Sequence, residues 1–441
     1  MKRIAVLALM ALNTVLGFSD EPVLTLEAAR TLALANSRSL AKYGLAVRAG
    51  VLDERSRLYS NLPSLSLQAG AGAGVKAMQE KTIRDAIEGS ISLSVSQKIF
   101  EGGKSFIYRR VAAINTEMAR NEATAEYFRI LDETDSAYYG VLEAAANLLT
   151  AESALETAEL SLSMTEIRMQ GGMADRGEYL KALSDRETEE SSRNRARRDL
   201  SLGRTKLQAL TGLAELPEAG AVDFGDYEDL ITAMGAAGDG GISALSGALW
   251  NRAVSANPGL LNAGLSGRNA EYDFSLAKKD FLPSVSASFS AGLDFSSGGP
   301  EFSPGRFSLS GSIPLDFWVI ANNTKKKRLV RDDAVLDYGD AVSSLETELK
   351  TSLFDVISQA ETVLSSRRAL EYAEQHFEYT MELWKLSGTS LSELSDASAL
   401  LNTGRGRLIQ AEYAFLLGLS KLRSLCGIPD EEELKMLLLG S

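Results

Sequence analysis

The two halves of this 441-residue chain carry the same sequence patterns in the same order. The matched pairs are 29–45 with 249–265, 62–72 with 282–292, 91–96 with 307–312, and 202–213 with 417–428. A repeat at a nearly constant offset indicates two copies of one structural unit. Each half is predicted to contain two short helices, two strands and two long helices. The join at 216–241 is rich in glycine and acidic residues, which predicts a linker.

Four segments alternate between apolar and polar residues, at 64–75, 90–96, 284–296 and 307–317. Alternation places the apolar residues on one face of a strand and the Ser, Gly and Gln residues on the other. A soluble sheet with its apolar face on a core would also alternate. Three features favour strands that cross a membrane: the polar face is small and uncharged, the lengths approach the ~9–11 residues of a spanning strand, and aromatic residues lie near the ends.

Four strands are too few to close a barrel. An open sheet edge in lipid leaves backbone groups without hydrogen-bond partners, at several kcal/mol each. The membrane interpretation therefore requires other copies of the chain to pair the edges, with two copies giving eight strands and three copies giving twelve.

The segment from Gly103 to about Gln170 contains no proline and is rich in helix-forming residues. Apolar residues recur at every seventh position in both halves, which is typical of coiled-coil packing. They are Val141, Leu148, Leu155, Leu162 and Met169, then Val335, Val342, Leu349, Val356, Val363, Leu370, Phe377 and Trp384. Each long helix is predicted to turn back at glycines, giving two long helical hairpins.

The N-terminus reads as a cleaved secretory signal at 1–19, with Lys2 and Arg3 before an apolar run that ends at Leu16. A membrane anchor is the alternative, but the run is shorter than the ~20 residues that a spanning helix needs. The chain is therefore predicted to be exported.

These pieces resemble the TolC-type outer-membrane efflux family over essentially the whole mature chain. The resemblance is carried by "LTLEAARTLALANSRSL" (24–40), by "SQKIFEGGKS" (96–105), by the G-x4-5-[DE]-x3-A patterns at the helical turns and by the L-x2-L-x-G endings of both halves. It implies a mainly α protomer that contributes four strands to a trimeric, twelve-stranded outer-membrane β-barrel, and long coiled-coil helices to a periplasmic α-barrel.

The resemblance also implies a division of the chain. The first repeat would span 20–215, with a β-hairpin at 62–100 and a helical hairpin at 103–213. The second would span 242–441, with a β-hairpin at 281–317, a helical hairpin at 319–426 and a C-terminal tail. The segment 216–241 would join them in an equatorial belt.

The function that the resemblance implies is a passive exit duct of a tripartite efflux or type I secretion system. Its partners would be two further copies of the chain, a periplasmic adaptor (membrane fusion protein), an inner-membrane pump and outer-membrane lipid. The duct would lie in the outer membrane with a large periplasmic part.

The same resemblance assigns roles at the helical turns. Glu393 and Asp396 match acidic residues that narrow the periplasmic opening of family members, where a negative potential favours cations. Gly171, Gly172 and Gly388 resemble the tips that adaptors grasp. Some members carry a basic residue that latches the opening at the position of Ser390. Arg176 and Glu178 are therefore alternative candidates for a latch.

Other functions find little support. A net charge of −13 argues against nucleic acid as a partner. "FEGGKS" lacks the spacing of a phosphate-binding loop, and no pattern predicts a catalytic, metal or cofactor site, so the chain is not expected to be an enzyme. "KKKR" (325–328) is interpreted as a group of cations at the place where the barrel would meet the helices, which would attract anionic headgroups. The alternative function is a secreted coiled-coil structural or adhesive protein without a pore.

Overall fold

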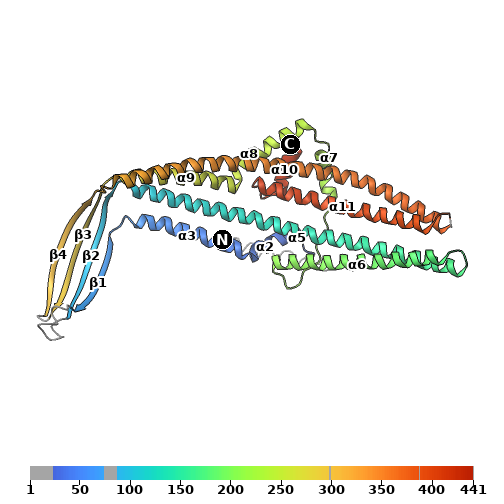
Figure 1. Cartoon of the computed structure of the whole chain (residues 1–441), viewed down its shortest axis with the longest axis horizontal. Helices are drawn as coiled ribbons and strands as arrows, with labels where there is room; N and C mark the ends of the chain where they lie inside the picture. The colour runs from blue at the N-terminus through green and yellow to red at the C-terminus, as the bar shows by residue number, and fades with distance from the viewer. Residues whose placement is uncertain (1–22, 74–86, 297–298, 387, 441) are drawn as a thin grey trace. The chain divides into compact units, whose positions relative to one another are not determined.

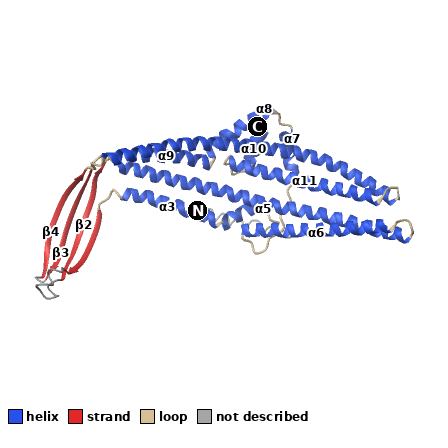
Figure 2. Ribbon diagram, viewed as in Figure 1, coloured by secondary structure: helices blue, strands red, loops and turns tan. Residues whose placement is uncertain are grey.

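Long helices and a four-stranded antiparallel sheet make up most of the chain (Figures 1 and 2). The computed structural model describes residues 23–73, 87–296, 299–386 and 388–440, so the predicted signal peptide lies outside the described residues. The predicted mainly α fold with a small β part is confirmed. The helices are α2 (Leu26–Asn36), α3 (Arg38–Tyr59), α5 (Lys104–Gln170), α6 (Arg176–Thr211), α7 (Glu228–Gly235), α8 (Asp239–Ala256), α9 (Pro258–Lys279), α10 (Phe317–Lys385), α11 (Leu391–Leu425) and α12 (Glu431–Leu439), with a short 3-10 turn, η2 (Phe224–Tyr227).

The chain forms two compact units, and each contains segments from both sequence repeats. One unit holds the described residues up to Ala41 together with Thr124–Pro258 and Ser343 onward. The other holds Lys42–Ala123 and Gly259–Val342, which include the whole sheet. Helices α5 and α10 contribute residues to both units. The predicted repeat boundaries stay a prediction, and the join at 216–241 contains η2, α7 and the start of α8.

The sheet has the order β1-β2-β3-β4, from β1 (Ser64–Ala73), β2 (Ile87–Glu101), β3 (Ser284–Ser296) and β4 (Gly299–Ser312). Its register aligns residues of one kind across the strands. Val95 pairs with Leu65 and Phe289, and Phe289 pairs with Phe307. Since side chains alternate between faces, these apolar residues share one face.

Serines share the opposite face of the sheet. Their hydroxyls are hydrogen-bonded in cross-strand pairs, 2.6–2.9 Å apart. The pairs are Ser64–Ser96, Ser66–Ser94, Ser284–Ser312, Ser286–Ser310 and Ser288–Ser308. Hydroxyls that satisfy one another in this way suit a face that meets water. The same face also carries charged side chains, which the sequence did not lead us to expect, because Lys98 pairs with Ser286, Asp294 with Ser90 and Arg306 with Ser290.

Two strands differ from their predicted bounds. β2 continues to Glu101 because Gln97 and Lys98 interrupt the apolar pattern without ending the pairing, which passes through a bulge between Lys98 and Phe100. β4 begins at Gly299 and ends at Ser312, whereas 307–317 was predicted. The proline after Ile313 has no N–H to donate to a ladder, so the apolar residues beyond it lie outside the strand. The predicted end of the first strand at 75 lies outside the described residues.

The helical core follows the seven-residue repeat. Val141, Leu155, Leu349, Val356, Val363 and Trp384 are all buried, as are Leu394, Leu401, Phe415 and Leu422 on α11. The other repeat residues of α5 and α10 are half-buried, apart from Val335, which is 63% exposed. At Gly418 an added Cβ would lie 3.0 Å from the Val356 side chain, so the glycine permits close approach of α10 and α11. No helix in the described part of the chain combines the length and apolarity of a membrane span.

Candidate functional site: the helical turns and a buried charge network

The turn of the first helical hairpin is built by two glycines. α5 ends at Gln170, and the backbone N–H groups of Gly171 and Gly172 donate to the carbonyls of Ile167 and Met169. Gly172 has a φ of +74°, a conformation that residues with a Cβ rarely adopt. The side chain of Asp175 then accepts a hydrogen bond from the backbone of Glu178 and starts α6.

Ser390, which the sequence resemblance places at a basic latch position, is the N-cap residue of α11. Its hydroxyl accepts a hydrogen bond from the backbone N–H of Glu393, and the Glu393 carboxylate accepts one from the backbone N–H of Ser390. This reciprocal pair is a capping box, which satisfies two otherwise free donors at the helix start. Glu393 therefore has a structural role in addition to its predicted role at the opening.

Asp396 is exposed one turn further along α11. It lines a cleft of about 250 Å³ together with Lys181, Asp185 and Glu189 of α6. Burial, with a further contribution from the charge of Asp185, raises the pKa of Glu189. The cleft is thus a region of negative charge at the turn end of the helical hairpins. Within the described residues no cluster of side chains has the make-up of a metal site.

Arg176 and Glu178 are both exposed, and neither forms an ion pair with any residue that the structure describes. Other residues connect the two hairpins. The Arg168 guanidinium lies 4.7 Å from the centroid of the Trp384 ring and donates to the Trp384 carbonyl. The hydroxyl of Ser395 on α11 donates to Asp185 on α6 at 2.7 Å.

An apolar cluster surrounds these connections. Trp384, Leu391 and Leu394 of the second hairpin pack with Ala182 of the first. Trp384 is 1% exposed, so the Arg168 contact is made at the edge of a buried ring. Sequence reasoning identified Trp384 only as the last residue of a heptad series. The connecting residues Arg168, Asp185 and Ser395 were missed.

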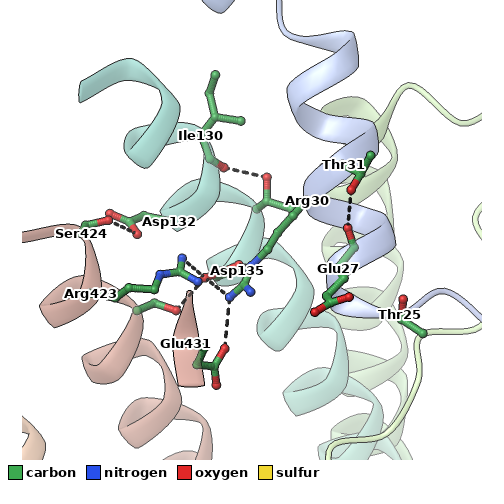
Figure 3. A network of polar contacts seen from close by, with 12 residues as sticks. Thr25, Glu27, Arg30, Thr31, Ile130, Asp132, Asp135, Arg423, Ser424 and Glu431 are labelled. Atoms are coloured by element: carbon green, nitrogen blue, oxygen red, sulfur yellow. Dashed lines mark hydrogen bonds and ion pairs between the residues drawn. The ribbon is translucent and has the colours of Figure 1, made fainter. Parts of the chain in front are cut away.

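A second polar site lies where α2, α5 and α11 meet (Figure 3). Asp135 of α5 is fully buried and binds two guanidinium groups. Arg30 makes a bidentate contact with its carboxylate at 2.6 and 2.7 Å, and Arg423 donates at 2.9 Å. Ser420 donates to the same carboxylate at 2.6 Å. A buried charge with this many donors holds its partners in a fixed geometry.

The network extends to the last helix of the chain. Glu431 at the start of α12 forms an ion pair with Arg30 at 3.5 Å and accepts a hydrogen bond from the Tyr227 hydroxyl. Next to Asp135, Asp132 accepts a hydrogen bond from Ser424 at 2.6 Å. Burial raises the pKa of Asp132 to about 6, although the Ser424 hydrogen bond acts in the opposite direction. Residues far apart in sequence are thereby joined to one point on α5.

Comparison with known sequences gives a single family. The family described as outer membrane efflux protein matches residues 29–213 and 249–428, one range in each half of the chain. No curated protein matches the chain.

Solved structures with a similar fold include several outer-membrane channels. The structure of CusC, which was solved in a study of folding and transmembrane channel formation, has a TM-score of 0.77 and 16% sequence identity. The match covers 94% of this chain and 95% of the CusC chain. The outer membrane channel CmeC of Campylobacter jejuni has 15% identity and a TM-score of 0.75, over 92% and 88%. The outer membrane protein VceC of Vibrio cholerae has 18% identity and a TM-score of 0.73, over 92% and 97%. At these identities the likeness shows a shared fold.

Proposed function

Since this chain belongs to the outer membrane efflux protein family, we propose that it is a passive exit duct in the outer membrane, formed by three copies of the chain. Each copy contributes four strands to a twelve-stranded barrel and its helical hairpins to a periplasmic tunnel. A periplasmic adaptor joins the duct to an inner-membrane pump, which supplies the energy. The signal peptide at 1–19 directs export and is removed.

The single observation that carries this proposal is a sheet with two unlike faces and two open edges. Leu65 and Leu67 are 69% and 70% exposed, and Phe307 and Leu309 are 70% and 63% exposed. These residues belong to β1 and β4, the outer strands of the sheet. Exposed apolar side chains suit lipid, but open backbone edges in lipid cost several kcal/mol for each group left without a partner. Pairing β1 of one copy with β4 of the next removes both edges.

The long helices support the same assembly. On α10 the side chains of Phe354, Tyr372 and Tyr379 are 53%, 69% and 63% exposed. Their spacings of 18 and 7 residues place all three on one face of the helix. We assign this surface to the neighbouring copy of the chain, because the sheet already requires neighbours on both sides.

The turns of the two helical hairpins form the periplasmic opening of the proposed duct. Two carboxylates from each copy, Glu393 and Asp396, give the opening a negative potential that favours cations. Gly171, Gly172 and Gly388 form the turns that contact the adaptor. The contacts from Arg168 to Trp384 and from Ser395 to Asp185 fasten the hairpins of one copy to each other, which is the role of a latch.

Charge neutralisation at the opening tests the duct. We expect the double variant Glu393→Gln and Asp396→Asn to reduce the preference of single channels for cations and to weaken their block by multivalent cations. Glutamine preserves the capping box at position 393, so the turn should remain intact. The measurement is single-channel conductance and reversal potential in planar bilayers.

The matched control removes two exposed carboxylates of the same hairpin, Glu371→Gln with Glu378→Gln on α10. We expect this control to conduct with the selectivity of the unmodified chain. Equal selectivity in all three proteins would refute the role of Glu393 and Asp396. A purified, membrane-inserted protein that forms no channel would refute the duct.

A further inference from the structure

All four junctions between helix and strand lie at one end of the sheet. β1 begins shortly after α3 ends at Tyr59, and β3 begins shortly after α9 ends at Lys279. β2 and β4 lead into α5 and α10. The register confirms the common end, because Ser284 pairs with both Glu101 and Ser312. Four helix ends therefore lie beside the same end of the sheet.

Cations gather on these four helix ends. They are Arg55 and Arg57 on α3, Arg109 and Arg110 on α5, Lys278 on α9, and Lys325 and Lys326 on α10, and all seven are exposed. At 1.5 Å per helical residue, the most distant of them, Lys326, lies about 14 Å along α10 from its first residue. We call these seven residues the basic collar.

None of the collar residues has a carboxylate partner among the residues that the structure describes. Neighbouring cations do: Lys104 pairs with Asp280 at 2.7 Å, and Lys327 pairs with Asp273 at 2.6 Å. Three collar residues instead lie over aromatic rings, which orient a cation without cancelling its charge. These are Arg57 over Tyr108, Arg110 over Tyr272 and Lys278 over Phe274.

Acidic residues near the same helix ends do not offset the collar. Asp53 and Glu54 lie on α3, and Asp316 precedes α10. Glu101, at the end of β2, forms an ion pair with Lys98 at 3.2 Å. The chain as a whole has a net charge of −13. A local excess of cations in such a chain creates a positive potential that attracts an anionic partner.

Apolar side chains occupy the junctions themselves, between the collar and the sheet. Tyr59 and Leu62 are 64% and 61% exposed, Phe106 is 72% exposed, and Leu315 and Trp318 are 69% and 71% exposed. An exposed aromatic band followed by cations is the arrangement of residues at a membrane surface, with rings at the level of the headgroups and cations beyond them.

We propose that the basic collar binds the headgroups of anionic phospholipids in the membrane leaflet next to the helices. This inference rests on the proposed membrane function and adds a specific lipid class to it. A headgroup layer is about 5–8 Å thick on each side of the hydrocarbon, and Lys and Arg side chains extend toward phosphate from further away. The collar lies on the helix ends that join the sheet at its common end, so a lipid whose tails contact the strands would place its phosphate near the cations.

The test compares lipids retained by the full-length, reconstituted protein. Vesicles of phosphatidylcholine alone are compared with vesicles in which part of it is replaced by phosphatidylglycerol. The protein is extracted in mild detergent, and the ratio of the two bound lipids is measured by mass spectrometry. The collar variant carries Arg55→Gln, Arg109→Gln, Lys325→Gln and Lys326→Gln. The control carries Arg195→Gln, Arg197→Gln, Arg198→Gln and Arg204→Gln, which removes the same charge from exposed positions on α6.

We expect the unmodified protein and the α6 control to retain phosphatidylglycerol in excess of its share in the vesicle, and high salt to reduce that excess. The excess should fall at least about fivefold in the collar variant, the factor expected for losing one cation at an anionic surface. Equal enrichment in both variants, or none in the unmodified protein, would overturn the collar while leaving the duct intact. A protein that enters neither kind of vesicle would instead overturn the membrane function and the collar with it.

Discussion

Replacing Asp135 with alanine is expected to lower the free energy of unfolding of the helical part of the chain by about 3–5 kcal/mol. The variant leaves the guanidinium groups of Arg30 and Arg423 in place without the carboxylate that binds them both. Arg423 is 1% exposed, so water cannot replace the lost partner. The measurement is urea unfolding followed by far-ultraviolet circular dichroism.

Two control variants distinguish the effect of the buried Asp135 carboxylate from the effect of changing its polar neighbours. Ser420→Ala removes one hydrogen bond to Asp135 and keeps both ion pairs, so a loss of only about 1 kcal/mol is expected. Asp132→Asn removes a carboxylate with a pKa that burial raises to about 6. The asparagine keeps a side-chain oxygen that can accept the hydrogen bond from Ser424. We expect little loss of stability at neutral pH. An Asp135→Ala protein as stable as these two would show that the network does not hold the helices together.

An arginine at Leu93 is expected to prevent stable insertion into the membrane, whereas an arginine at Ser94 is expected to be tolerated. Leu93 lies near the middle of β2, opposite Leu67 and Ala291 on the apolar face. A charge on the lipid face near the bilayer midplane costs about 2–4 kcal/mol for each copy of the chain. Ser94, the next residue, lies on the serine face, which the proposed duct would expose to water. The measurement is the fraction of each variant found as assembled protein in the outer membrane.

The two variants form a matched pair, because they place the same residue at adjacent positions of one strand. Stability of the water-soluble parts and expression level should therefore be affected alike. If Ser94→Arg proved the more harmful, the two faces would be assigned the wrong way round. If both inserted as well as the unmodified chain, the sheet would not be in lipid.

The strands and long helices of this fold could be predicted because the spacing of apolar residues within one strand or one helix depends only on the geometry of that element. Alternation located the strands, and the seven-residue repeat located buried residues such as Val356 and Trp384. The end of β4 was wrong because the alternation continues through Ile313 while the following proline stops the hydrogen-bond ladder. Val335 follows the repeat and is nevertheless exposed, since a repeat does not specify where a partner helix is present.

The buried network around Asp135 was not predicted. Its residues come from positions 30, 135, 420, 423 and 431, and each is an ordinary polar residue within its own helix. Only the packing of α2 and α11 against α5 brings them together. The capping box was different, because Ser390 followed by Glu393 is a local signal that the sequence already contained.

The assembly state is the most direct test of the central claim that several copies complete one barrel. Light scattering on the detergent-solubilised protein, corrected for bound detergent, gives the number of chains in a particle. The account predicts three chains, each of at most 47.4 kDa. A particle that holds one chain, with its strands still formed, would contradict the account.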